Sequence, residues 1–420
     1  MRFLRTATSR TFLSLRVRNF RLYFIGQGIS ISGTWMQSVA QGWLVVTLPG
    51  FTPVDLGITI ALPFLPMLLF GPFAGVVIDR SDKRKVLYAT QTVAGLLALA
   101  LGILVVTHHV SLPVIWTLAA LLGLVNLFDN PARQSFVQEM VGRDLLPNAV
   151  SLNSALINMG RVVGPALSAI LLATVSIAAC FFVNAASYAG VIVALALMRR
   201  TEIYRIRTVG RAKHQARAGL AYAWANREIR TVLTSVVIVG TFAFNFTVTL
   251  PIFVHTVLRG SATEYAFVTC SFGFGAVLGG LYVAHRSRPT RPLLTGLALA
   301  FGALLGVVAF APNIEIACAA LVPMGFASLA FVSTANATLQ LNSAEEMRGR
   351  VMSLYAMGFL GTTPIGALLI SLISAASSAR VALAVGAVAT LGAGAFLWAT
   401  SREGSRVVLG VGASPSTSPA

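Results

Sequence analysis

The sequence predicts an all-α membrane protein with twelve transmembrane helices arranged as two six-helix pseudo-repeats. First, 56% of the 420 residues are hydrophobic and only 10% are charged, whereas a water-soluble protein of this length would expose far more charge. Second, apolar runs of about 20 residues, the length that crosses about 30 Å of hydrocarbon, recur along the whole chain. Third, one basic stretch divides these runs into two sets of six.

Twelve apolar runs supply the predicted helices. The first six lie near 22–48, 55–78, 86–107, 112–130, 148–174 and 177–198, and the second six lie near 231–257, 264–285, 292–311, 314–338, 351–374 and 380–400. Several contain proline or glycine, which membrane helices tolerate when neighbouring groups satisfy the freed backbone. The predicted organisation is a leader (1–21), an N-terminal six-helix bundle (22–198), a linker (199–230), a C-terminal six-helix bundle (231–400) and a tail (401–420).

The segments outside the two bundles differ in composition. The basic leader is expected to be retained rather than cleaved as a signal peptide, because the apolar run after it is too long and many others follow. In the linker, Leu220, Ala223 and Trp224 fall at helical spacing, which predicts a short interfacial helix. The Ser- and Pro-rich composition of the tail predicts disorder.

Lysine and arginine are distributed unevenly between the two sides of the membrane. With the N-terminus in the cytoplasm, 28 of the 31 basic residues lie in segments on the cytoplasmic side. Cytoplasmic loops carry such an excess, so both termini are predicted to be cytoplasmic and the lipid bilayer is the expected surrounding. Because the basic residues lie in short loops between apolar runs, the net charge of +18 does not predict a nucleic-acid partner.

An acid–base cluster, Gly75–Lys85 (GVVIDRSDKRK), joins the second and third predicted helices. Gly75 is expected to let two helices approach closely where the second helix ends, and Asp79 can meet helix N-termini or basic groups across the turn. The alternative is a basic loop that only obeys the positive-inside rule. The stretch 280–291 is a weaker counterpart in the second half and lacks the acid, which indicates an internal repeat.

Polar side chains inside the apolar runs are the candidate binding residues. A polar stripe on a membrane helix cannot face lipid cheaply, so it faces water, a substrate or another helix. The predicted cavity residues are Gln27, Thr34, Gln37, Gln41, Asn158, Arg161, Asn245 and Asn336. The alternative is that such residues form interhelical hydrogen bonds, and that Arg161 is a structural arginine. Without a midspan carboxylate, the cavity is expected to favour neutral or anionic cargo.

Several motifs resemble those of a known transporter family. The pattern G-x-x-x-D-R-x-x-[RK]-R-[RK] at Gly75–Lys85 resembles the loop between the second and third helices of the major facilitator superfamily. The stretches Arg18–Leu22 (RNFRL), Asn130–Gln134 (NPARQ) and Met347–Leu354 (MRGRVMSL) resemble its enterobactin-exporter and macrolide-efflux branch. The motif Gly160-x-x-x-Gly164-Pro165 is similar to the fifth-helix motif of exporters in that superfamily.

This resemblance implies a secondary transporter of the bacterial inner membrane. It implies proton-coupled efflux of a small organic molecule, such as a drug or a siderophore, by alternating access between two six-helix bundles. The implied conformational-switch residues are Gly75, Asp79, Arg80, Lys83 and Arg84, with Arg133 or Arg348 as partners of Asp79 in the outward-open state. Gly160, Gly164 and Pro165 are the implied helix-packing residues.

Other functions and the coupling residue are left open by the sequence. Uptake or facilitated diffusion of a metabolite is the alternative within transport. A membrane enzyme is disfavoured by the lack of a catalytic motif, and a sensor by the lack of a soluble domain. All thirteen acidic residues lie in loops or near span ends, and Asp129, followed by His255, is the candidate proton carrier. A monomer without cofactor or metal is expected.

Overall fold

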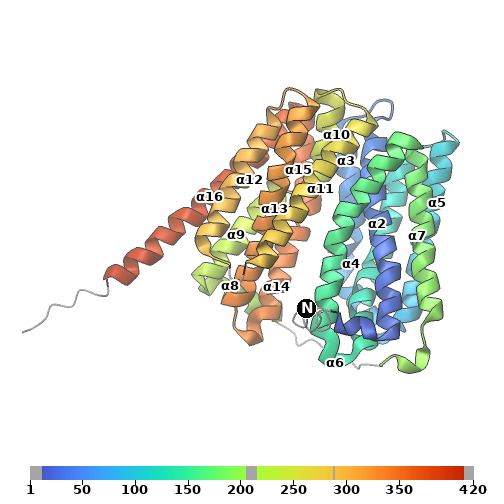
Figure 1. Cartoon of the computed structure of the whole chain (residues 1–420), viewed down its shortest axis with the longest axis horizontal. Coiled ribbons are helices and arrows are strands. Elements are labelled where there is room, and N and C mark those ends of the chain that lie inside the picture. Colours follow the sequence, from blue (N-terminus) through green and yellow to red (C-terminus); the bar gives the residue numbers. More distant parts are fainter. Residues whose placement is uncertain (1–11, 205–214, 287–288, 411–420) are drawn as a thin grey trace, which may run out of the picture. The chain divides into compact units, whose positions relative to one another are not determined.

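The computed structural model describes residues 12–204, 215–286 and 289–410. These residues are almost entirely helical, and no strand occurs among them (Figure 1). Within the described part, eleven helical segments are long and apolar enough to cross a membrane. The twelfth helix of the fold is α2, Arg18–Val46, whose 29 residues are long enough to span a bilayer. It carries a stripe of polar side chains that includes the predicted cavity residues Gln27, Thr34, Gln37 and Gln41. The predicted all-α membrane fold is therefore confirmed.

The helices follow the predicted order along the chain. The first half contains η1 (Leu13–Arg16), α2, α3 (Pro53–Ala61), η2 (Leu62–Phe64), α4 (Leu65–Arg80), α5 (Lys83–Val106), α6 (Leu112–Thr174) and α7 (Ile177–Leu197). The connection and the second half contain η3 (Arg200–Glu202), α8 (Gln215–Ala225), α9 (Arg227–Phe242), α10 (Phe246–Ile252), the π-turn η4 (Phe253–Val257), α11 (Ala262–His285), α12 (Arg291–Ala309), α13 (Ile314–Asn342), α14 (Glu345–Leu360), α15 (Thr363–Ala376) and α16 (Ala379–Gly410).

Glycine and polar caps mark several helix boundaries. Gly142 has φ +71°, a conformation that L side chains rarely adopt, and it divides α6 into the spans Leu112–Gly142 and Asp144–Thr174. Asp82 caps α5 by accepting a hydrogen bond from the backbone N–H of Lys85 at 3.2 Å, and Ser176 caps α7 in the same way. Specific residues therefore set where α5 and α7 begin and where α6 is divided.

Two helices of the second half are interrupted near their middle. The chain leaves the helix between α9 and α10, around Asn245, and again between α14 and α15, at Gly361–Thr362. The first interruption lies at a boundary between two compact units of the chain, and the second lies a few residues before another boundary. The first unit comprises residues 12–204, 246–273 and 367–379, and the second comprises 215–245, 274–286, 289–366 and 380–410. The compact units therefore differ from the sequence halves 22–198 and 231–400.

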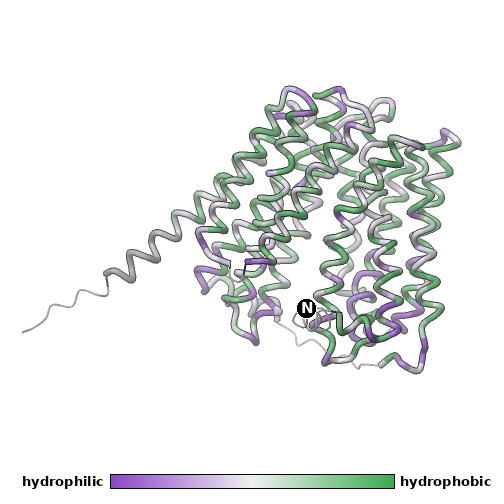
Figure 2. Tube along the Cα trace, viewed as in Figure 1, coloured by the Kyte–Doolittle hydropathy of each residue, from purple (hydrophilic) through white to green (hydrophobic). Residues whose placement is uncertain are grey.

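The apolar side chains fall into a packed interior and an outward-facing surface. In the first unit, Phe20, Tyr23, Leu87 and Phe136 belong to one buried cluster that joins α2, α5 and α6. Large apolar side chains such as Phe73 are exposed. Hydrophilic residues gather at the helix ends (Figure 2). Since lipid tails are as apolar as leucine, the helices associate through close packing and polar contacts rather than through the hydrophobic effect.

The segments outside the bundles are partly helical. Helix α8 contains Leu220, Ala223 and Trp224, and its place at the membrane interface stays a prediction. Helix α16 continues to Gly410, and the first ten residues of the expected disordered tail are therefore helical, because no proline interrupts the chain there. Residues 411–420 and most of the leader lie outside the described residues.

Candidate functional site

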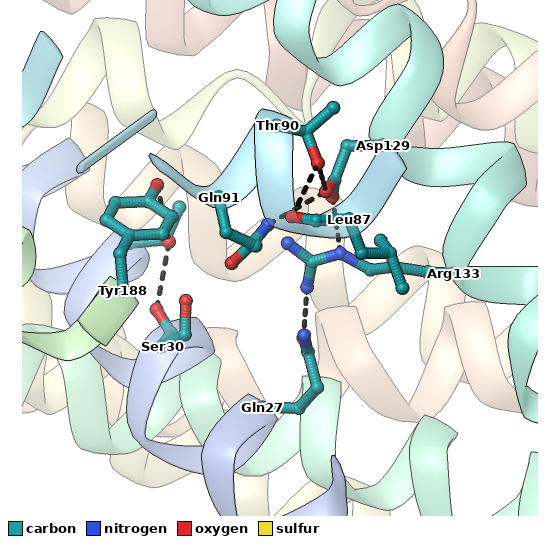
Figure 3. A network of polar contacts seen from close by, with 9 residues as sticks. Gln27, Ser30, Leu87, Thr90, Gln91, Asp129, Arg133 and Tyr188 are labelled. Atoms are coloured by element: carbon teal, nitrogen blue, oxygen red, sulfur yellow. Dashed lines mark hydrogen bonds and ion pairs between the residues drawn. The ribbon is translucent and has the colours of Figure 1, made fainter. Parts of the chain in front are cut away.

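A buried network of polar side chains lies inside the first unit, centred on Asp129 of α6 (Figure 3). The Asp129 carboxylate is 2% exposed. Its Oδ1 accepts hydrogen bonds from Thr90 Oγ1 at 2.6 Å and from Gln91 Nε2 at 2.8 Å, both from α5. Its Oδ2 pairs with Arg133 Nε one helical turn along α6. The carboxylate charge is thus matched by a cation and by two neutral donors.

Arg133 extends this network to a third helix. Its Nη1 donates a hydrogen bond to Oε1 of Gln27 on α2, so one guanidinium connects α2 with α6 while the carboxylate connects α6 with α5. Among the described residues, Gln27 Nε2 and Gln91 Oε1 find no hydrogen-bond partner, although both side chains are buried. The network therefore contains one donor group, Gln27 Nε2, and one acceptor, Gln91 Oε1, that could form new hydrogen bonds if the network rearranged.

A second polar cluster lies further along α2. Asn184 of α7 donates from Nδ2 to Gln37 Oε1 at 2.6 Å, and its Oδ1 accepts from Ser187 at 3.0 Å. A Cβ at Gly33 would lie 2.6 Å from Ser187 Oγ, so the close approach of α2 and α7 requires glycine at this position. Thr34 Oγ1 also lies 3.4 Å from the Tyr188 hydroxyl.

These contacts show what two polar side chains of α2, Gln27 and Gln37, bind. Gln27 and Gln37 are buried and bonded to neighbouring helices of their own bundle. For these two residues the structure thus favours interhelical hydrogen bonding, the alternative raised by the sequence, over the open cavity. Thr34 is exposed and Gln41 is half-buried, so their assignment to a cavity stays a prediction.

Arg161 lies near the middle of the span Asp144–Thr174, on the part of α6 that packs against α2. Its guanidinium carbon is 5.3 Å from the centroid of the Trp35 ring, a cation–π contact. The approach of the two helices depends on glycine, because a Cβ at Gly160 would overlap the Ile31 side chain and one at Gly164 would lie 2.8 Å from Met36 N. The glycines of the predicted packing motif therefore face α2 beside Arg161.

Replacing Gly164 with alanine is expected to destabilise the protein by about 1–3 kcal/mol, because the added methyl group meets backbone atoms of α2 that cannot move aside. Chemical unfolding in detergent would measure this change. Gly75→Ala is a matched control, since a Cβ at Gly75 meets no heavy atom within 4 Å and the variant should change stability far less. Equal effects of the two variants would contradict the tight α2–α6 contact.

In the acid–base loop Gly75–Lys85, the charged residues Lys83 and Arg84 bind neighbouring helices. Lys83 Nζ pairs with Glu139 Oε1 of α6 at 3.2 Å. Arg84 Nε and Nη2 donate to the Leu195 carbonyl at 3.0 and 2.5 Å, at the C-terminal end of α7, where a cation is favoured. The two basic side chains therefore tie the start of α5 to α6 and α7.

The other predicted switch residues have fewer contacts. Asp79 and Arg80 are exposed. Arg133 pairs with Asp129 here rather than with Asp79, and Arg348 Nε donates to the Gln340 carbonyl at 3.0 Å. The close helix approach predicted at Gly75 is wrong for this structure, because the space beside this glycine is open. The partner of Asp79 in the outward-open state stays a prediction.

The predicted cavity residues of the second half, Asn245 and Asn336, form hydrogen bonds with residues four positions away in the sequence. Asn245 is buried at the interruption between α9 and α10, and its Nδ2 donates to the Thr241 carbonyl at 2.7 Å. A Cβ at Gly366 would lie 2.9 Å from Asn245 Nδ2, so glycine brings α15 against this interruption. Asn336 Oδ1 accepts from Gln340 Nε2 at 2.6 Å. The side chain of Asn158 lies outside the described part of the chain.

His255, the second candidate proton carrier, lies in an aromatic cluster of the first unit. Its ring meets Trp43 edge-on at 5.7 Å and Phe51 at 6.4 Å, while Trp43 stacks on Tyr265 at 5.4 Å. Trp43 lies near the C-terminal end of α2, and Tyr265 belongs to α11. The cluster thus packs residues from the second half of the sequence against the first half.

The sequence analysis missed several residues of these networks, among them Thr90, Gln91, Glu139 and Asn184. Thr90, Gln91 and Asn184 lie within apolar runs, and Thr90 and Gln91 follow one another in the run 86–107, whereas Glu139 lies between the runs 112–130 and 148–174. A search for polar side chains inside every predicted span would have found Thr90, Gln91 and Asn184. Their partners could not be found in this way, because Asp129 lies about 40 positions from Thr90.

The sequence profile of the transmembrane secretion effectors matches residues 9–404. The chain belongs to this family. Among curated proteins, the chain is 26% identical to the staphyloferrin A transporter of Staphylococcus aureus, over 84% of the chain and 88% of the relative. It is 26% identical to the multidrug efflux pump Tap of Mycolicibacterium fortuitum, over 82% and 85%, and 23% identical to macrolide efflux protein A of Streptococcus pyogenes, over 85% and 90%.

Solved structures share the fold of this chain. A bacterial homologue of the human lysosomal transporter Spinster, crystallised in an inward-facing and unoccupied conformation, matches with a TM-score of 0.70 and 13% identity, over 95% of this chain and 99% of that one. The nucleoside transporter NupG matches with a TM-score of 0.69 and 11% identity, over 92% and 98%.

Family and fold together confirm the predicted resemblance to the efflux branch of the major facilitator superfamily. The chain is a multi-pass membrane protein of a transporter superfamily, which is not an enzyme class. Such a protein has a small-molecule substrate and works embedded in a lipid bilayer.

Proposed function

We propose that this protein exports a small organic molecule across the bacterial inner membrane in exchange for protons, by alternating access. The observation that carries the proposal is the buried Asp129–Arg133 pair, a titratable carboxylate inside a membrane helix that also contacts two other helices. Ionisable residues inside membrane spans are expensive and typically serve proton or substrate pathways. The direction is taken from the relatives named as efflux pumps.

Protonation of Asp129 would rearrange the network in a definite way. The neutral carboxyl group binds Thr90, Gln91 and the guanidinium more weakly than the carboxylate does, because charge-assisted hydrogen bonds are about twice as strong as neutral ones. Arg133 then keeps its charge without a counter-charge and favours water or another acceptor. Since Arg133 and Asp129 connect α2, α5 and α6, proton binding would change how these three helices pack.

Contacts within the first unit suggest where the transporter closes. The segments 246–273 and 367–379 of the second half pack against α2 and α3, and glycine permits the approach, since a Cβ at Gly57 would lie 2.6 Å from Ser371 Cβ. With both termini in the cytoplasm, as the distribution of basic residues favours, these contacts lie at the outer face. They would then form the outer seal, which opens when a monomer releases its cargo.

Cells that produce the protein are expected to accumulate less of an exported compound than cells that lack it. A suitable panel contains a macrolide, a carboxylate siderophore and a cationic dye, each measured with and without a protonophore. The proposal expects lower accumulation of at least one compound and loss of that difference when the protonophore dissipates the proton gradient. Higher accumulation would show uptake instead, and a difference that survives the protonophore would contradict proton coupling.

A further inference from the structure

In the second unit, the part of α11 after residue 273 packs closely against α13 at two glycines (Figure 1). A Cβ at Gly275 would lie 2.7 Å from the Val322 carbonyl carbon, and one at Gly279 would lie 2.9 Å from that of Phe326. One turn further on, the Tyr282 and Phe326 rings pack with their centroids 5.4 Å apart.

A pocket of about 240 Å³ opens at this end of the α11–α13 contact. Its walls include the apolar side chains of Val283, Leu293 and Leu341, together with the polar residues Arg286, Thr334 and Gln340. The pocket therefore combines an apolar wall with a cation and neutral hydrogen-bonding groups. This combination suits an amphiphile rather than an inorganic ion or a purely apolar molecule.

Two features of the pocket indicate that it binds a ligand. Thr334 is fully buried, and its hydroxyl finds no hydrogen-bond partner among the described residues, which is costly unless a bound molecule supplies one. Arg286 is held in place by its neighbour, because its Nη1 donates to the Tyr282 hydroxyl at 2.7 Å and its guanidinium lies over that ring at 5.9 Å. A positioned guanidinium at the end of a membrane helix suits a phosphate group.

We propose that this pocket binds the headgroup of an anionic phospholipid. Arg286 would bind the phosphate, Thr334 would donate its hydroxyl to an oxygen of the glycerol region, and Leu341 would cover the start of an acyl chain. The surrounding sequence favours a negatively charged lipid, because the six residues 286–291 carry three arginines. Basic pockets between membrane helices are a recurrent form of anionic headgroup recognition.

Thermal unfolding of the purified full chain in zwitterionic detergent would test this proposal, with dioleoyl-phosphatidylglycerol as the probe. Dioleoyl-phosphatidylcholine and inorganic phosphate serve as the comparison ligands. Phosphatidylglycerol is expected to raise the Tm more than phosphatidylcholine at equal concentration, while inorganic phosphate leaves it unchanged. Arg286→Gln should weaken the apparent affinity for phosphatidylglycerol about fivefold, the usual effect of one basic residue at an anionic surface.

Thr334→Val separates ligand binding from packing, because it exchanges the unpartnered hydroxyl for a methyl group of similar size. Without lipid its Tm should be unchanged or higher, whereas its response to phosphatidylglycerol should shrink. Thr338→Val and Arg200→Gln, which lie outside the pocket, are matched controls that should respond as the wild type does.

Three outcomes would overturn the proposal. The first is an equal response to both lipids, which would show that the headgroup charge is not recognised. The second is a Tm rise with inorganic phosphate as large as that with phosphatidylglycerol, which would indicate a site for a free anion. The third is a full lipid response in both Arg286→Gln and Thr334→Val.

Discussion

Replacing Arg133 with glutamine is expected to destabilise the protein by about 3–5 kcal/mol and to abolish transport. The change removes the cation from a carboxylate that is 2% exposed, and breaking a buried ion pair from one side leaves an uncompensated charge. Chemical unfolding in detergent would measure the loss. Arg199→Gln is the matched control, because the Arg199–Glu202 pair is exposed and such pairs contribute at most about 1 kcal/mol.

The double variant Asp129→Asn/Arg133→Gln separates the structural role of the pair from its coupling role. Without either charge, the remaining amides and Thr90 can still form hydrogen bonds, so the double variant should recover most of the stability lost in Arg133→Gln. Transport driven by a pH gradient in proteoliposomes should remain absent, since the titratable group is gone. A double variant that transports with the same proton dependence as the wild type would contradict the proposed role of Asp129.

The fold was predictable because burial in lipid imposes strong constraints on composition. Runs such as 177–198 contain almost nothing but apolar residues, and only helices can satisfy the backbone at that depth in a chain of this kind. Helix ends were less predictable. Hydropathy reports where lipid contact stops, whereas α2 begins at Arg18 and α6 breaks only at Gly142, where hydrogen bonding and backbone conformation decide.

The candidate site was predictable in its residues and not in its contacts. The sequence showed that Gln27 and Gln37 share a polar stripe, yet a stripe does not reveal whether its neighbour is a cavity or another helix. Asp129 and Arg133 are spaced by one helical turn, so their pairing could have been proposed from the sequence. The prediction relied instead on family resemblance, which assigned Arg133 to Asp79.

Each half of the sequence has an ion pair at the start of its third span. In the first half, Lys83 at the start of α5 pairs with Glu139 of α6. In the second half, Arg291 at the start of α12 pairs with Glu228 of α9 and donates to Thr400 of α16 at 2.6 Å. Each half thus uses a base at the start of its third span to bind an acid on another helix, although the two acids occupy unrelated sequence positions.

Arg161→Ala is expected to abolish transport while leaving the amount of protein in the membrane unchanged. A charge in the middle of a span costs about 2.5–3.5 kcal/mol on insertion scales, so the removal of Arg161 should not prevent insertion. Its guanidinium stacks on Trp35 and presents a positive charge inside the first unit. We propose that this charge binds an anionic group of the cargo.

Two further variants distinguish charge from shape at this position. Arg161→Lys should retain partial transport, because lysine keeps the charge but lacks the planar group that stacks on the indole. Trp35→Phe keeps an aromatic ring beside Arg161 and should lower transport less than Arg161→Ala does. Transport of each anionic and neutral compound in proteoliposomes, with membrane levels measured in parallel, would check these expectations. An alanine variant that transports normally, or one that fails to reach the membrane, would contradict a role for Arg161 in binding cargo.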